Sequence, residues 1–269
     1  MFGNCLDMVG KKAIKKEVEA VAKDANKKAS LFLKNFIKNI KKFNICDFKI
    51  GKTEILISKH GKMTIYIMMI LCFLSLLCTG VGFLTTTLMF CVLFTLWFCR
   101  DPERVIPDKK NIIVSPCDGI VISIDKTKLP EELNSEDKDN YTKISVLLKI
   151  TDVHVQRIPV DSVVKQVEYI KGSFINASFD KASKDNERNI LLLERKNGDK
   201  ICISQIAGLV SRRIICDVKK DEICQIGERY GMIKFGSRVE IYLPNDYEVE
   251  VLEGQRLVGG ETIVATFEK

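Results

Sequence analysis

The chain has 269 residues, a formal net charge of +7 and 46% hydrophobic residues, which is enough for one large domain or two small ones. Ten cysteines occur without a Cys-x-x-Cys pair and beside only two histidines, so the spacing argues against a zinc cluster and a disulfide framework. The cysteines therefore indicate reduced thiols of a protein that faces the cytoplasm, and no metal site is expected.

The positive charge is concentrated at the N-terminus. Residues 1–52 contain 13 lysines, no arginine and five acidic residues, a net charge of +8, whereas the remaining residues sum to −1. Apolar residues with helical spacing predict a lysine-rich amphipathic helix over residues 10–45. These residues are Ile14, Val18, Val21, Ala25, Phe32, Phe36, Ile40 and Phe43. The neighbouring apolar run favours binding to an anionic lipid surface over nucleic-acid binding or a merely solvated helix.

Residues 63–99 contain no charged side chain. One membrane-spanning helix needs only ~20 residues, and Gly80 and Gly82 divide this run into two apolar arms. Lysines precede the run and Arg100 and Arg104 follow it, so both ends are expected on the cytoplasmic side of the cell membrane. A helical membrane hairpin is predicted. A buried hairpin of a soluble protein is the alternative, and a signal peptide fits poorly because the run begins too far along the chain.

Short runs rich in β-branched residues follow from about residue 112. They cover residues 112–124, 144–150, 163–169, 190–194, 200–206, 238–243 and 247–252. Asn197-Gly198 predicts a tight hairpin turn between two of them. We expect three parts: an N-terminal extension (1–60), a membrane hairpin (61–99) and a mainly β catalytic domain (100–269) of barrel or sandwich type, which resembles lipoyl-type hybrid folds.

Three short segments in the β region contain candidate catalytic groups. Asp118 ends a Ser-Pro-Cys-Asp-Gly turn, His154 is the only histidine after the apolar run, and Ser237 follows Gly236. A serine after a glycine can attack the unshielded carbonyl carbon behind it, because glycine permits strained backbone angles. Each segment also has an ordinary interpretation: turns at Asp118-Gly119 and Gly236-Ser237, and a buried histidine. Together, Ser, His and Asp are the parts of an activated nucleophile.

These segments, with residues 98–104, 152–159, 179–189 and 205–213, resemble the short bacterial class of phosphatidylserine decarboxylase. The resemblance extends from about residue 63 to residue 266 and excludes the first 55 or so residues. It implies a proenzyme in which Ser237 attacks the carbonyl of Gly236 and the chain then breaks into a large subunit (1–236) and a small subunit (237–269). Ser237 becomes a pyruvoyl group, which forms a Schiff base with phosphatidylserine and accepts electrons as CO₂ leaves. The product is phosphatidylethanolamine, and no metal or external cofactor is implied.

The resemblance is weaker for the residues that assist Ser237. Longer classes of the family have a His-x-x-His-x-Pro pattern, but Arg157 stands in place of the second histidine. We therefore expect His154 to transfer protons during decarboxylation or in a shared role, and Arg157 to bind substrate. Asp118 matches the family's Ser-Pro-x-Asp-Gly turn, although Cys117 replaces a common alanine, and is expected to orient a base or contact the lipid amine.

Two other functions remain open at this point. Asp180-Lys181-Ala182 resembles the turn of lipoyl-bearing carrier domains, although such a lysine belongs between two symmetric strands. A membrane-anchored serine hydrolase that acts through Ser237 without cutting its own chain is the second alternative. An intact-mass spectrum separates all three: cleavage before residue 237, a lipoyl adduct on Lys181, or an uncut chain.

Overall fold

The computed structural model describes residue 27 and residues 48–50, 53–133, 141–179, 181–209, 213–234 and 237–268. Contacts divide the chain into two compact units, Met1–Asp47 and Phe48–Lys269, and only the second is discussed below. The amphipathic helix expected over residues 10–45 lies outside the described residues, apart from helical Lys27.

Two long helices lie near the start of the second unit. Helix α2 (Lys59–Thr79) starts after Ser58, whose Oγ accepts a hydrogen bond from the backbone N of His60 at 3.4 Å. It ends at Gly80, whose φ of +67° lies in the left-handed region that favours glycine. Helix α3 (Phe83–Phe98) follows, and a 2.8 Å hydrogen bond between the hydroxyls of Ser75 and Thr85 joins the two helices.

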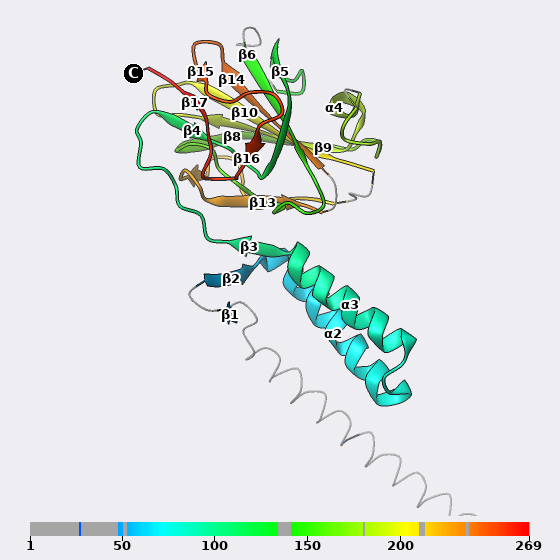
Figure 1. The fold of residues 1–269 in the computed structure, drawn as a ribbon. Coiled ribbons are helices and arrows are strands. Elements are labelled where there is room, and N and C mark those ends of the chain that lie inside the picture. The colour runs from blue at the N-terminus through cyan, green and yellow to red at the C-terminus, as the bar shows by residue number, and fades with distance from the viewer. Residues whose placement is uncertain are drawn as a thin grey trace, which may run out of the picture. The chain divides into compact units, whose positions relative to one another are not determined.

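The remaining elements are almost all strands (Figure 1). They are β1 (Phe48–Ile50), β2 (Thr53–Ile57), β3 (Arg100–Pro102), β4 (Ile112–Val114), β5 (Gly119–Thr127), β6 (Tyr141–Leu148), β7 (Val155–Arg157), β8 (Ser162–Ile170), β9 (Arg188–Glu194), β10 (Lys200–Ala207), β11 (Ile214–Cys216), β12 (Ile223–Cys224), β13 (Arg229–Ile233), β14 (Ser237–Pro244), β15 (Glu248–Val249), β16 (Arg256–Leu257) and β17 (Ile263–Thr266). The one-turn helix α4 (Ala182–Asp185) lies between β8 and β9. The mainly β fold expected from the sequence is confirmed.

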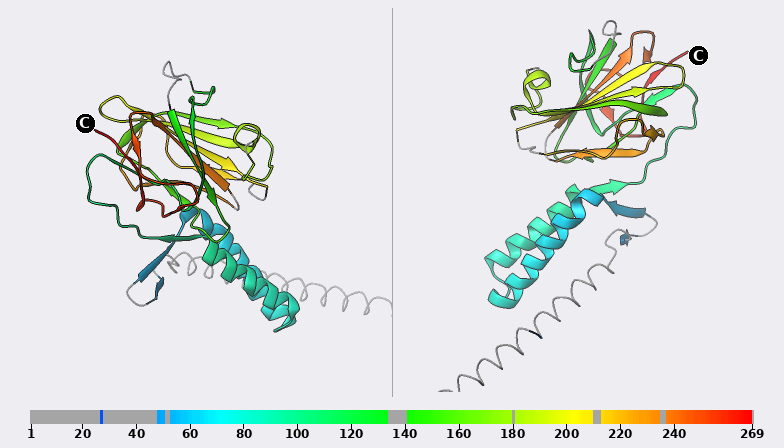
Figure 2. Two further views of the ribbon diagram at one scale, coloured as in Figure 1. Left: turned by 45° about the horizontal axis from the view of Figure 1, so that its top comes forward. Right: turned by 180° about the vertical axis from the view of Figure 1, so that it is seen from behind.

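The largest sheet is antiparallel and has the strand order β12-β8-β9-β10-β14-β6-β5-β16. It curls into a half-barrel, and three-stranded sheets β11-β13-β7 and β15-β17-β4 supply further strands around it (Figure 2). The turn predicted at Asn197-Gly198 joins β9 to β10, and Gly198 has a φ of +92°. The run expected over residues 112–124 divides into β4 and β5, because the turn at Asp118 interrupts it.

The main hydrophobic core lies on the inner face of this sheet. Alternate residues of β14, namely Val239, Ile241 and Leu243, point into it and are fully buried. The other face of β14 presents Arg238, Glu240 and Tyr242, and Tyr242 belongs to a second, smaller buried cluster with Leu129 and Leu133. The sheet is therefore covered on both faces near the start of β14, where Ser237 lies.

Candidate active site

Ser237 is the first residue of β14, a central strand of the large sheet. It pairs with Ala207 at the end of β10 on one side and with Leu148 at the end of β6 on the other. Its side chain is fully buried, and its Oγ has no hydrogen-bond partner among the described residues. A buried hydroxyl without a hydrogen-bond partner is costly, so the position of Ser237 calls for a functional explanation. Gly236 lies outside the described residues.

The register of the sheet brings the turn at Asp118 to the same end as Ser237. Ile120 of β5 pairs with Leu147, so Gly119 stands beside Leu148, which in turn pairs with Ser237. Gly119 and Ser237 are therefore two strand spacings apart, about 10 Å between backbones. Gly119 has a φ of +154°, and a Cβ there would lie only 2.6 Å from the carbonyl O of Leu147. Glycine is thus required for this close approach.

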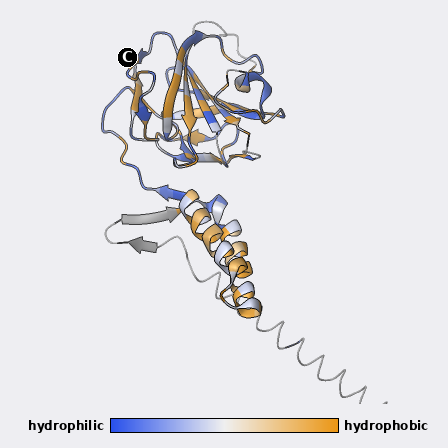
Figure 3. Ribbon diagram, turned by 45° about the vertical axis from the view of Figure 1, so that its right-hand side comes forward, coloured by the Kyte–Doolittle hydropathy of each residue, from blue (hydrophilic) through white to orange (hydrophobic). Residues whose placement is uncertain are grey.

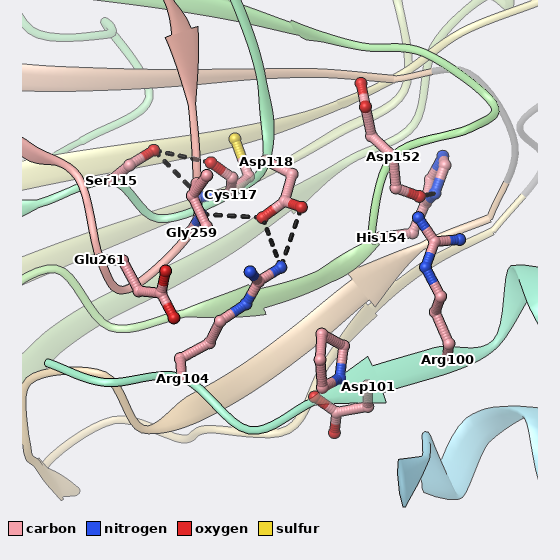
Figure 4. A network of polar contacts seen from close by, with 12 residues as sticks. Arg100, Asp101, Arg104, Ser115, Cys117, Asp118, Asp152, His154, Gly259 and Glu261 are labelled. Carbon is pink, nitrogen blue, oxygen red and sulfur yellow. Dashed lines mark hydrogen bonds and ion pairs between the residues drawn. The ribbon is translucent and has the colours of Figure 1, made fainter. Parts of the chain in front are cut away.

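The Asp118 carboxylate is fixed by two neighbours (Figure 4). Arg104 Nη2 donates to both of its oxygens at 2.9 and 3.0 Å, and the backbone N of Gly259 donates to Oδ1 at 2.8 Å. The side chain of Asp118 is only 13% exposed. The expected carboxylate is thus held in one orientation by an arginine from the segment that follows α3 and by the backbone of Gly259.

His154 lies in the loop after β6 and is fully buried. Its Nδ1 is 2.9 Å from the carbonyl O of Asp152, so Nδ1 bears the proton and Nε2 has a free lone pair. Nε2 has no partner among the described residues. Burial lowers the pKa of His154 from 6.5 to about 4, although its bond to Asp152 opposes this change. The ring is therefore neutral near pH 7 and able to accept a proton.

The end of the apolar helix α3 forms one wall of the histidine site. Phe98, the last residue of α3, packs against the His154 ring with 4.4 Å between ring centroids and 40° between ring planes. Two residues later Arg100 Nη2 donates to the carbonyl O of Thr151 at 2.6 Å. Burial lowers the pKa of Arg100, and the carboxylates of Asp118 and Asp152 oppose this effect. Figure 4 shows Arg100 beside His154 and Asp152.

Arg157 lies in a different environment from that expected of a substrate-binding residue. Its guanidinium donates to Asp101 Oδ1 at 3.2 Å and to the carbonyl oxygens of Gly227 and Pro102 at 3.0 and 2.9 Å. Both charged side chains of the pair are 7% exposed. The backbone N of Arg157 also donates to the carbonyl O of Pro116 at 2.8 Å. Arg157 therefore joins β7 to β3 and to the turn before Asp118.

Lys181 is not placed as a carrier lysine would be. It is exposed and immediately precedes helix α4, within a connection between β8 and β9, rather than at the tip of a tight hairpin. The geometry gives no support to the carrier function.

Comparisons with known proteins agree with the geometry. A sequence model of the family described as phosphatidylserine decarboxylase matches residues 92–265. The chain belongs to the phosphatidylserine decarboxylase family. A relative from Wolbachia sp. subsp. Brugia malayi (strain TRS), named phosphatidylserine decarboxylase proenzyme, is 40% identical over 214 residues, covering 79% of this chain and 92% of the relative. Relatives with the same name from Rickettsia prowazekii (strain Madrid E) and Cereibacter sphaeroides (strain ATCC 17025 / ATH 2.4.3) are similar. The first is 42% identical over 187 residues (70% of this chain, 78% of the relative), and the second 47% over 177 (65% and 76%).

In this member of the phosphatidylserine decarboxylase family, Asn186 holds the end of β10 beside Ser237. Its Nδ2 donates to the carbonyl oxygens of Ala207 and Ile175 at 2.6 and 2.8 Å, and its Oδ1 accepts from the backbone N of Ile175. Ala207 is the residue that pairs with Ser237. Asn186 lies within the segment 179–189 that resembles the family, but the sequence predicts no role for it.

A buried ion pair behind Ser237 was also missed from the sequence. Arg238 Nη2 is 2.9 Å from Glu240 Oε1, and both side chains are 1% exposed. Ser183 of α4 donates to the same Glu240 oxygen at 2.6 Å, and Arg238 Nη1 donates to the carbonyl O of Phe179 at 3.5 Å. The ion pair therefore fixes the segment that contains α4 over the outer face of β14. Charged residues that alternate along a strand normally indicate a face exposed to solvent, so the sequence of β14 does not predict that the segment containing α4 covers this face.

Proposed function

We propose that this member of the phosphatidylserine decarboxylase family is a proenzyme that cuts its own chain between Gly236 and Ser237 and then decarboxylates phosphatidylserine to phosphatidylethanolamine. The observation that supports it best is the buried Ser237 hydroxyl, unpartnered among the described residues, at the start of a central strand. Family membership and the relatives named as proenzymes support the same reaction.

The self-cleavage step uses atoms that belong to the chain itself. Ser237 Oγ attacks the carbonyl carbon of Gly236, and the peptide bond is replaced by an ester. Loss of the Ser237 Cα proton then expels the Gly236 carboxylate, which breaks the chain and leaves a double bond in residue 237. Addition of water and loss of ammonia give a pyruvoyl group. A serine is required because its oxygen is first the nucleophile and then the leaving group.

The surroundings of Ser237 suit a pyruvoyl group. The side chain lies on the inner face of the sheet, where Val239 and Ile241 belong to the apolar core. Its Oγ has no hydrogen-bond partner among the described residues, so a ketone oxygen in its place would lose no such bond. When present, this group supplies a carbonyl that accepts the electron pair released with CO₂. No metal is part of this proposal.

We assign roles to three of the chain's side chains. His154 Nε2, neutral and unpartnered among the described residues, accepts a proton and returns it to the carbon that loses CO₂. Asp118, held in place by Arg104, orients the amine of the substrate or a base in cleavage. Arg157 holds the turn of Asp118 against β7 through its bonds to Pro116 and Asp101 instead of binding substrate directly.

A lipid substrate also explains the apolar helices. Helix α2 is long and apolar enough to cross a membrane, with a mean hydropathy of 2.0 over its most apolar window, and α3 is a shorter apolar helix. Figure 3 shows apolar residues over both helices, and Leu77, Phe83 and Phe90 are each more than 60% exposed. We propose that both helices enter the membrane as a hairpin, with the β domain on the cytoplasmic side next to basic flanking residues. Kinship with lipoyl-type folds remains a prediction.

The decisive experiment is Ser237→Ala in the full chain, with Ser123→Ala on β5 as the control. We expect Ser237→Ala to remain a single band on a denaturing gel and to release no CO₂ from phosphatidylserine. The control should split into two fragments, the smaller with an intact mass that fits residues 237–269 bearing a pyruvoyl group. Cleavage or CO₂ release by Ser237→Ala would overturn the proposal. An acyl adduct on an uncut wild-type chain would favour the hydrolase instead.

A further inference from the structure

Three exposed apolar side chains surround the end of the sheet where Ser237 lies. Ile150 follows Leu148 by two residues and Leu209 follows Ala207 by two residues, and Leu148 and Ala207 are the strand partners of Ser237. Phe179 is the third, since its carbonyl O accepts a hydrogen bond from Arg238. Ile150, Phe179 and Leu209 are 47%, 61% and 65% exposed. We call these three residues the apolar rim.

Basic residues lie within a few positions of each part of the apolar rim in the sequence. Lys149 is next to Ile150, Lys181 and Lys184 follow Phe179, and Arg213 follows Leu209; all four are exposed. Exposed apolar side chains with lysine and arginine beside them are typical of surfaces that enter the headgroup layer of an anionic membrane. Apolar side chains exposed together around a site otherwise cost solubility without a benefit.

The apolar rim is also continuous with the apolar helices. Arg100 donates from Nη2 to the carbonyl O of Thr151, next to Ile150, and from Nη1 to the carbonyl O of Trp97 at 3.1 Å. Its guanidinium lies 4.8 Å from the centre of the Trp97 ring. Tryptophan and arginine concentrate where a helix leaves the hydrocarbon layer. The turn containing Ile150 is thus bonded to the point at which α3 would emerge from a bilayer.

From these observations we propose that the apolar rim docks on the surface of the bilayer that the helices enter. Docking places the Ser237 end of the sheet against the headgroup layer, so that a phospholipid headgroup reaches Ser237 while its acyl chains remain in the membrane. This inference rests on the proposed function for the identity of the headgroup. The contact with the bilayer can be measured without any turnover.

Tryptophan fluorescence tests the docking independently of activity. The chain has one tryptophan, so Trp97→Phe provides a background in which Leu209→Trp is the only reporter. Ile223→Trp is the matched control: Ile223 is 78% exposed, and β12 pairs with β8 at Ser162 and Val163, at the opposite end of the sheet. Both full-length variants are placed in phosphatidylserine-containing vesicles with lipids brominated near the headgroup. We expect bromine to quench the tryptophan at 209 and to leave that at 223 unquenched.

Activity gives the second measurement. We compare the rate of CO₂ release from long-chain phosphatidylserine in vesicles with that from a short-chain, water-soluble phosphatidylserine. Serine replacements of Ile150 and Leu209 together should lower the ratio of the two rates about tenfold, because two of the three apolar side chains of the rim then no longer enter the bilayer. Ile223→Ser should leave the ratio unchanged. Phe179→Trp in the Trp97→Phe background serves as the reporter if Leu209→Trp does not fold.

The outcomes separate the two proposals. Absence of quenching at both 209 and 179, or an unchanged rate ratio, would overturn the docking of the apolar rim even if the wild-type chain is an active decarboxylase. Quenching at 209 in the reporter variant, together with no CO₂ release by the wild-type chain, would instead support docking and overturn the proposed function.

Discussion

The contact between Phe98 and His154 lets us predict how a substitution at Phe98 changes the pKa of His154. Burial lowers the pKa of His154 from 6.5 to about 4, which corresponds to roughly 3 kcal/mol of additional free energy for protonating the ring. Phe98 covers the ring with 4.4 Å between centroids and is itself 2% exposed. Phe98→Ala should admit water to the ring and raise the pKa of His154 toward its ordinary value, by about one pH unit. Phe98→Leu keeps an apolar cover, so it should leave the pKa low.

The assay is the pH dependence of CO₂ release, because the acid limb of the profile follows protonation of His154 if Nε2 transfers the proton. The limb should lie near pH 4 for the wild-type chain and Phe98→Leu, and near pH 5 for Phe98→Ala. Direct titration by NMR is simple because the chain has only two histidines, and His60→Gln identifies the signals of His154. An acid limb that is the same in all three chains, or a native pKa near 6.5, would refute the reasoning.

Further predictions concern stability and processing. The native pKa of His154 lies below its unfolded value, so this residue favours folding above pH 6.5, and its contribution is lost as pH falls toward 4. The urea midpoint of unfolding should therefore fall between pH 6.5 and pH 4, and it should fall less in His154→Gln than in the wild-type chain. Asp118→Asn should slow chain cleavage on denaturing gels about 100-fold, because the charge beside Arg104 is lost, and normal processing would contradict its role. Asp101→Asn should cost about 3 kcal/mol of unfolding free energy by leaving Arg157 without its buried counter-charge, whereas a loss below about 1 kcal/mol would contradict the ion pair.

Much of the β domain could be predicted because its strands have local signals. Ile190 to Leu193 and Ile201 to Ile203 consist mostly of β-branched and leucine residues, and Asn197-Gly198 marks the turn between them. The short strands β11, β12 and β16 have no such signal, since each has only two or three residues and depends on partners elsewhere in the chain. Their existence follows from tertiary pairing.

The candidate site was predicted less completely, for physical reasons. Ser237, His154 and Asp118 stand out by residue type and by family pattern, and the register of β14, β6 and β5 brings Ser237 and the Asp118 turn to one end of the sheet. Their partners are separated from them along the chain: Arg157 meets Asp101 across 56 residues, and Phe98 meets His154 across the same distance. No local pattern encodes such contacts. Roles for the three residues remain proposals.

The central position of β14 has a consequence for the fragments after chain cleavage. Strand β14 pairs with β6 along its whole length and with β10 from Ser237 to Tyr242, and β17 near the C-terminus pairs with β4. A fragment of residues 237–269 would thus supply β14 and β16 to the large sheet and β15 and β17 to a three-stranded sheet, without a core of its own. Its dissociation would require global unfolding of the β domain, so the two fragments should stay together and cleavage should be invisible to size-exclusion chromatography. The cleaved protein would behave as a single folded domain. Its two fragments should not exchange between molecules.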